Sequence, residues 1–123
     1  WEKWTFIAAA GVVTCLFRAP VGAIVDAGGR AHVLRIIEEL EAVAAAASHP
    51  VSERSHAMTV SMLTAEGSEF TSSLYRDVTA GLPSEAEHIL GDLARKAAEL
   101  GVDTPLLDLT LVQLRAGEAQ RRP

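Results

Sequence analysis

The sequence predicts an all-α domain, and three observations lead to that prediction. Apolar residues recur at spacings of three and four along several stretches, as they do on the buried face of a helix. Glycine, proline, serine and threonine separate these stretches at the points where helices would begin and end. No stretch alternates apolar and polar residues as a half-buried strand does. With 123 residues, 49% of them hydrophobic, the chain is expected to form one compact bundle of about six to seven helices.

Capping residues, glycines and prolines set the expected helix limits. In chain order the helices cover residues 1–17, 21–26, 31 to the break at 49–50, 52–65, 71–80, 84–100, and 105 onward. The first is apolar almost throughout, and its small residues would let another backbone approach closely. Pro20 suits the start of the second helix, and Gly28 with Gly29 ends it.

The third and fourth helices are expected to bury one side each. The third carries a single apolar stripe made of Val33, Ile36, Ile37, Leu40, Val43 and Ala44. Pro50 breaks it, because proline cannot continue the hydrogen bonding of a helix. The fourth places Met58, Met62 and Ala65 on one side.

The last three helices are defined by caps. The fifth stops at Gly81. Ser84 followed by Glu87 has the spacing of a capping box, which predicts Ser84 as the N-cap of the sixth helix. Thr104 is expected to cap the final helix. The apolar side of that helix comprises Leu106, Leu107, Leu109, Leu111 and Leu114.

Composition argues against several functions. The net charge is −5 and the basic residues are mostly scattered, which argues against nucleic acid. The longest uncharged run, residues 4–17, is shorter than the roughly 20 residues of a membrane-spanning helix. Cys15 is the single cysteine, so no internal disulfide can form, and a cytoplasmic location is expected. The chain opens inside an apolar segment, which favours a domain excised from a longer protein.

The most informative stretch is SSLYRDVTAGLPSEAEHILG, residues 72–91. It contains, in order, Ser72, Ser73, Asp77, Gly81, Glu85 and Gly91. This order is similar to the signature of the C-terminal domain of ketopantoate reductases (2-dehydropantoate 2-reductases). The opening Trp1-Glu2-Lys3 resembles the family's W-x-K segment, and GVDTP at residues 101–105 resembles its G-V-x-T-P.

The resemblance implies a fold like that of the 6-phosphogluconate dehydrogenase C-terminal domain. It implies that residues 1–123 are one helical domain, separated from an N-terminal Rossmann domain that binds most of the NADP. No G-x-G-x-x-G occurs in this chain to bind the nucleotide. The implied activity is NADPH-dependent reduction of a 2-oxo acid, in pantothenate biosynthesis or a related ketone reduction. The whole enzyme is expected to be a homodimer, and this domain alone to be inactive.

The resemblance also implies roles for three side chains. Lys3 corresponds to the catalytic proton donor, Ser73 to a residue that binds the substrate carboxylate, and Glu85 to an acidic residue near the substrate and the edge of the cofactor site. Each also has an ordinary structural interpretation. Lys3 could extend its amine to solvent, Ser73 could cap a helix, and Glu85 could face a helix dipole.

Two positions depart from the family pattern. Ile7 and Gly11 stand four and eight residues after Lys3, where the family commonly has asparagines that hydrogen-bond the substrate. Neither side chain can donate or accept a hydrogen bond. A bulkier or less polar 2-oxo acid, or another ketone, therefore fits as well as ketopantoate.

Two other interpretations of the sequence remain. Glu53 with His56, and Glu85 with His88, both have Glu-x-x-His spacing, which di-iron helical bundles use together with two further glutamates. Glu2 and Glu39 are the candidates for those glutamates, although the family resemblance predicts no metal. A helical dimerisation module without a chemical site is the third interpretation, because the first helix is rich in small and apolar residues.

Overall fold

The structure is a computed structural model, and it describes residues 1–121. Its elements are α1 (Glu2–Phe17), α2 (Val21–Asp26), α3 (Arg30–Ala46), α4 (Glu53–Leu63), α5 (Ser73–Thr79), the π-helical turn η1 (Glu87–Gly91), α6 (Asp92–Glu99) and α7 (Pro105–Arg121). No strand occurs within residues 1–121. The predicted all-α fold is therefore confirmed, and most helix limits lie within a few residues of those expected.

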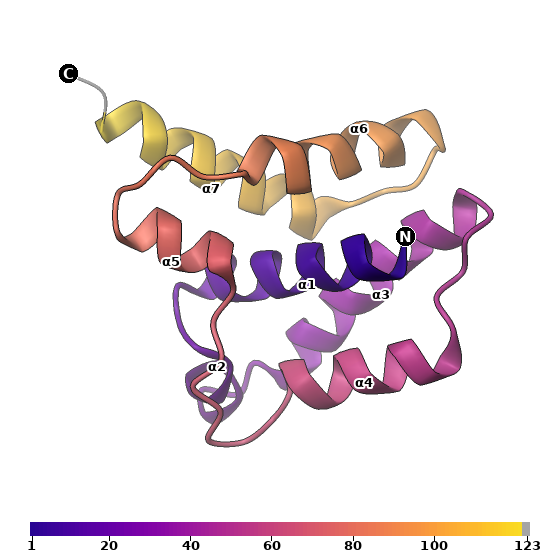
Figure 1. Ribbon diagram of the computed structural model, residues 1–123, viewed down its shortest axis with the longest axis horizontal. Helices are drawn as coiled ribbons and strands as arrows, with labels where there is room; N and C mark the ends of the chain where they lie inside the picture. Colours follow the sequence, from indigo (N-terminus) through magenta and orange to yellow (C-terminus); the bar gives the residue numbers. More distant parts are fainter. Residues whose placement is uncertain (122–123) are drawn as a thin grey trace.

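Helix α1 is the centre of the domain. Figure 1 shows it lying between the α6–α7 layer and the α3–α4 layer, with α5 close to its C-terminal half. Every residue from Ala8 to Cys15 is buried, because the helix is apolar on all sides and other helices surround it. Its alanines and Gly11 keep the helix thin enough for several neighbours to pack against it at once.

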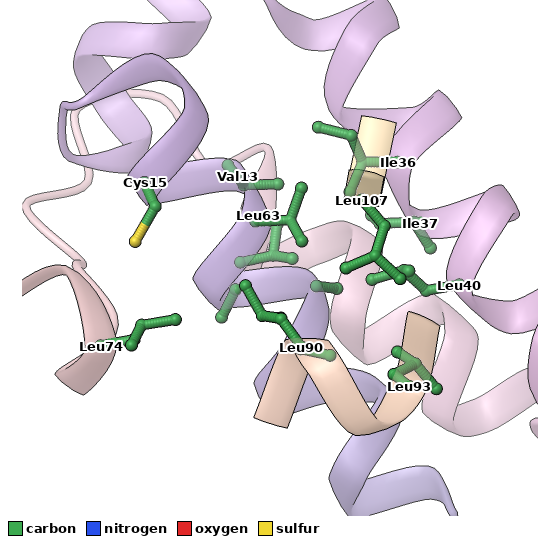
Figure 2. Packing of buried hydrophobic residues seen from close by; sticks show 14 of the residues in the cluster. Val13, Cys15, Ile36, Ile37, Leu40, Leu63, Leu74, Leu90, Leu93 and Leu107 are labelled. Carbon is green, nitrogen blue, oxygen red and sulfur yellow. The ribbon is translucent and has the colours of Figure 1, made fainter. Parts of the chain in front are cut away.

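The core joins side chains from helices far apart in the sequence, as Figure 2 shows. Its largest fully buried members are Ile36, Ile37, Leu40, Leu63, Leu90, Leu93 and Leu107. All six residues of the predicted stripe on α3 are buried, which confirms that prediction. Full burial of each large aliphatic side chain contributes ~1.5–3 kcal/mol, so these contacts dominate the stability of the domain.

Two predicted apolar faces are partly wrong. On α4 the buried residues are Thr59 and Leu63, while Met58 and Met62 are 55% and 38% exposed. On α7 the core-facing residues are spaced by three and four, so Leu109 falls outside the stripe and is 55% exposed. Hydrophobicity alone does not say which side of a short helix faces the core.

The predicted capping box at the sixth helix is not formed. The Ser84 hydroxyl accepts a long hydrogen bond from the Ala86 N–H, 3.4 Å. The Glu87 carboxylate instead accepts two hydrogen bonds from the Arg115 guanidinium of α7, at 2.6 and 2.9 Å. The chain then forms the π turn η1, where a Cβ at position Gly91 would overlap the Glu87 carboxylate. Glu87 is therefore bonded to Arg115, 28 residues later, instead of to the backbone at Ser84.

The cap of α7 also comes from a distant residue. Glu39 of α3 accepts hydrogen bonds from the N–H groups of Leu106 and Leu107, at 3.1 and 2.9 Å. Thr104, predicted as the cap, directs its hydroxyl to the Asp108 carboxylate at 3.1 Å. Burial raises the pKa of Glu39, and the two N–H groups oppose that rise. This carboxylate therefore ties α3 to α7 through the free amides of a helix N-terminus.

Candidate active site

Lys3 lies in the first turn of α1, and its side chain is exposed. Three aromatic rings pack together beside this turn. The ring centroids of Trp1 and Trp4 are 4.9 Å apart, and the Trp1 indole stacks on His49 with centroids 6.0 Å apart and planes 15° apart. The rings hold the start of the helix in place while the lysine amine remains open to solvent.

Ser73 is the first residue of α5. Its side chain is exposed, whereas that of the preceding Ser72 is buried. The preceding Ser72 is the N-cap, and its hydroxyl accepts a hydrogen bond from the Tyr75 N–H at 2.9 Å. The same hydroxyl lies 2.8 Å from that of Thr14 in α1. The capping role considered for the serine pair thus belongs to Ser72, which leaves the Ser73 hydroxyl available to a ligand.

Glu85 lies immediately before the first helical residue, Ala86, and its side chain is exposed. Its backbone carbonyl accepts a hydrogen bond from the Ile89 N–H at 2.8 Å. The Ile89 carbonyl in turn accepts one from the Trp4 indole N–H at 2.9 Å. Two hydrogen bonds therefore connect the turn that carries Lys3 with the turn that carries Glu85.

The structure attaches the segments carrying all three predicted residues to α1. Helix α5 contacts α1 near Gly11 and Thr14, and η1 contacts it at Trp4. Among the ion pairs of residues 1–121, none joins Lys3 to Glu85. Their predicted approach as a charge pair stays a prediction for the complete protein, as do the roles of all three side chains.

The helix face that carries Lys3 continues through Ile7 and Gly11, which follow at intervals of four residues. Ile7 is half-buried, and Gly11 is buried. A Cβ built on Gly11 would lie 3.1 Å from Leu74 Cδ2 and 4.0 Å from Leu90 Cδ2. Leucines therefore cover the position where the family pattern has its second asparagine, and the site is apolar on this side.

The di-iron interpretation gains no support from the geometry. His56 pairs with Glu41 of α3, with 2.6 Å between Nδ1 and Oε1. Glu39 caps α7, and Glu2 accepts a hydrogen bond from the Ser52 N–H at 2.7 Å. This bond lowers the pKa of Glu2. The part of the chain that the structure describes contains no group of three or more histidine, cysteine, aspartate or glutamate side chains that could hold a metal ion.

Sequence reasoning missed two contacts that organise the site. One is the hydrogen bond from Trp4 to Ile89, and the other is the Glu87–Arg115 ion pair. The first could have been anticipated in part, because a tryptophan packed into a protein usually donates its indole N–H to an acceptor. No local pattern could select Arg115 among the arginines of the chain.

The fold is an all-α domain in which the exposed Lys3, Ser73 and Glu85 lie on α1 and on two segments that pack against it. Residues 1–118 match the family described as Ketopantoate reductase PanE/ApbA C terminal. The chain belongs to this family of ketopantoate reductase C-terminal domains. The family resemblance inferred from the three sequence patterns is thereby confirmed.

Individual relatives agree with the family match. The chain is 30% identical over 122 residues to "Uncharacterized oxidoreductase YkpB" of Bacillus subtilis (strain 168), covering 98% of this chain and 40% of the relative. A dimeric ketopantoate reductase from Staphylococcus aureus superposes with a TM-score of 0.82 at 27% identity, covering 98% of this chain and 42% of that one. A 2-dehydropantoate 2-reductase from Methylococcus capsulatus gives 0.83 at 26% identity, covering 100% and 40%.

The chain thus spans about two fifths of the length of these relatives. Within residues 1–121, no helix is both long and apolar enough to cross a membrane.

Proposed function

We propose that this chain is the substrate-binding and proton-donating domain of an NADPH-dependent reductase of 2-oxo acids. The observation that carries the proposal is the common attachment to α1 of the segments bearing Lys3, Ser73 and Glu85. All three side chains are exposed, and the order of these residues in the sequence resembles the family pattern. The related proteins whose names state an activity are ketopantoate reductases, so the complete protein is proposed to act in pantothenate biosynthesis or a related ketone reduction.

Each side chain has one proposed task. The Lys3 ammonium donates a proton to the carbonyl oxygen of the substrate as the carbonyl carbon is reduced. The Ser73 hydroxyl hydrogen-bonds the substrate carboxylate. Glu85 orients Lys3 and lies at the edge of the cofactor site, where its carboxylate can accept hydrogen bonds from hydroxyl groups. NADPH, when bound, supplies the hydride for the carbonyl carbon.

Most of the NADPH site is proposed to lie in a Rossmann domain of the complete protein. A dinucleotide site of that kind needs a strand, a glycine-rich turn and a helix N-terminus. Residues 1–121 provide no strand, and Glu85 is the residue of this domain that we propose to reach the edge of the cofactor site. The domain by itself is therefore proposed to be inactive, and the complete enzyme to work in the cytoplasm.

The preferred substrate is proposed to carry an apolar group where ketopantoate carries a hydroxyl. Ile7 offers no hydrogen bond, and an unpaired buried hydroxyl costs ~1–3 kcal/mol. Leu74 and Leu90 pack over Gly11, so the surroundings of the second amide position are apolar. A 2-oxo acid with a branched or unbranched hydrocarbon side chain meets both conditions.

A homodimer is the proposed assembly. The Staphylococcus aureus relative is described as dimeric. On α7 of this chain, Leu109 and Val112 are 55% and 61% exposed, and exposed apolar side chains of this kind favour a protein contact. Light scattering of the complete protein tests the assembly, and a monodisperse monomer at high concentration would contradict it.

Steady-state kinetics of the complete protein tests the activity. NADPH oxidation is followed with a series of 2-oxo acids that includes ketopantoate. Lys3→Ala is expected to lower kcat by about 10²–10⁴-fold with a small change in KM, because a proton donor acts mainly in the transition state. Lys96→Ala, at the chain's other lysine and also exposed, is the matched control and is expected to leave kcat unchanged. A Lys3→Ala enzyme within a few-fold of wild type would overturn the proposal.

A further inference from the structure

Trp4 connects two parts of the candidate site that are far apart in the sequence. Its indole N–H donates a hydrogen bond to the Ile89 carbonyl, 85 residues later, with a distance of 2.9 Å. Trp4 directly follows Lys3 within the first turn of α1. Its position along the backbone is therefore rigidly coupled to that of Lys3.

Ile89 is coupled equally closely to Glu85. The Ile89 N–H donates to the Glu85 carbonyl at 2.8 Å, so the backbone of one residue, Ile89, makes both hydrogen bonds of the connection. Ile89 belongs to the π turn η1, where the Asp92 N–H bonds the Glu87 carbonyl five residues back. Such turns are rare and often occur at functional sites.

The π turn η1 is also held by α7 and by the core. Glu87 forms a two-bond ion pair with Arg115 of α7, and Leu90 is completely buried in the core. The Trp4 ring is also supported, because it packs on Trp1, which stacks on His49. Other contacts thus hold both Trp4 and η1 in place, and the Trp4–Ile89 hydrogen bond joins the two.

We propose that Trp4 is a positioning residue, whose indole N–H sets the distance and direction between Lys3 and Glu85. The inference rests on the proposed function of those two residues. A proton donor displaced by about 1 Å loses on the order of a hundredfold in rate, so one hydrogen bond at this point has a large effect on catalysis. Trp4 touches neither substrate nor cofactor in this account and acts through Lys3.

The test uses the complete protein and two variants at position 4. Trp4→Phe removes the N–H and part of the ring, and replacement of Trp4 by benzothienylalanine substitutes sulfur for the N–H while keeping the ring shape. Both are expected to lower kcat about ten- to hundredfold, with KM for the 2-oxo acid changed less than threefold. Loss of general stability would instead lower the active fraction and would be greater for the phenylalanine variant.

Two further measurements separate positioning from structure. In a Lys3→Ala background, either change at position 4 is expected to alter kcat less than twofold, because the lysine amine through which Trp4 acts is absent. Without any substrate, hydrogen exchange of the backbone amides in residues 85–91 is expected to become faster in both variants.

The outcomes distinguish this inference from the proposed function. A wild-type protein that reduces no 2-oxo acid, or one insensitive to Lys3→Ala, overturns the proposed function and this inference with it. A large effect of Lys3→Ala together with near wild-type kcat for benzothienylalanine at position 4 overturns this inference alone. Equal effects at position 4 with and without Lys3 also overturn it, since they would show a purely structural role.

Discussion

The hydroxyl oxygens of Thr14 and Ser72 lie 2.8 Å apart in the core, although 58 residues separate them in the sequence. Thr14 donates its proton to the Ala10 carbonyl at 2.7 Å, so Ser72 must donate to Thr14. Ser72 still accepts from the Tyr75 N–H. This buried relay joins α1 to the first turn of α5, which begins at Ser73.

Thr14→Val tests that relay. The substitution leaves the buried Ser72 hydroxyl without an acceptor, and the free energy of unfolding is expected to fall by ~1–3 kcal/mol. Urea denaturation measures the loss. Thr110→Val is the matched control, because Thr110 is equally buried but bonds only the Leu106 carbonyl of its own helix. A loss for Thr14→Val no larger than that of the control would contradict the interpretation.

Ile7→Asn tests the proposed substrate preference. An amide at this half-buried position is expected to raise kcat/KM for ketopantoate about tenfold, relative to a 2-oxo acid without a hydroxyl, since ~1–3 kcal/mol of unpaired hydroxyl would be recovered. Steady-state kinetics on both substrates gives the ratio. An unchanged ratio would show that position 7 does not contact the substrate.

Gly11→Asn should behave differently from Ile7→Asn. Leu74 Cδ2 would lie 3.1 Å from the new Cβ, so α5 or the leucine must shift to admit any side chain. Overpacking of this kind is expected to cost ~1–3 kcal/mol of stability without improving activity toward ketopantoate. Thermal unfolding and kinetics measured on the same sample decide whether both expectations hold.

Glu39 predicts a specific dependence of stability on pH. Burial raises its pKa in the folded protein above the ordinary value of 4.5, so the folded state binds the proton more tightly than the unfolded state. Its contribution to stability is complete below pH 4.5 and is lost as the pH rises through the folded pKa. The advantage of wild type over Glu39→Gln should therefore shrink across that range in denaturation curves.

Cys15 should be almost inert toward thiol reagents. Burial raises the pKa of its thiol from 9.0 to about 11, only partly opposed by Arg18. The thiolate is the reactive form, so alkylation of the folded protein at pH 8 is expected to be at least roughly a hundredfold slower than in urea. Mass spectrometry of the peptide containing Cys15 gives both rates. Equal rates would mean that α1 opens readily.

The sequence predicted the features that depend on neighbouring residues. Ser52 and Ser72 were near the helix starts expected for α4 and α5, and both accept the backbone N–H three residues later. The stripe on α3 also followed from periodicity alone. Glu39 and Glu87 could not be placed in this way, since each finds its partner on α7 after the chain has folded. The π turn begins at one of these residues, Glu87, and was expected to be part of an ordinary helix.

The site shows the same division. Lys3, Ser73 and Glu85 were selected by their order in a family pattern, and the structure attaches the segment of each one to α1. The link through Trp4 depends on the direction of one indole N–H, which the order of residues does not encode. This hydrogen bond could be identified only from the structure, which places the Ile89 carbonyl next to the Trp4 indole.

The central position of α1 has a consequence for the order of events during synthesis. Within this domain an early helix is covered by a much later one: the Leu16 carbonyl of α1 accepts a hydrogen bond from the Gln113 side chain of α7, 97 residues later, at 3.3 Å. A ribosome would have to release nearly all of α7 before this apolar helix is fully enclosed. Until then α1 is a natural target for chaperones that bind exposed apolar segments, and the domain completes its folding only after α7 has been made.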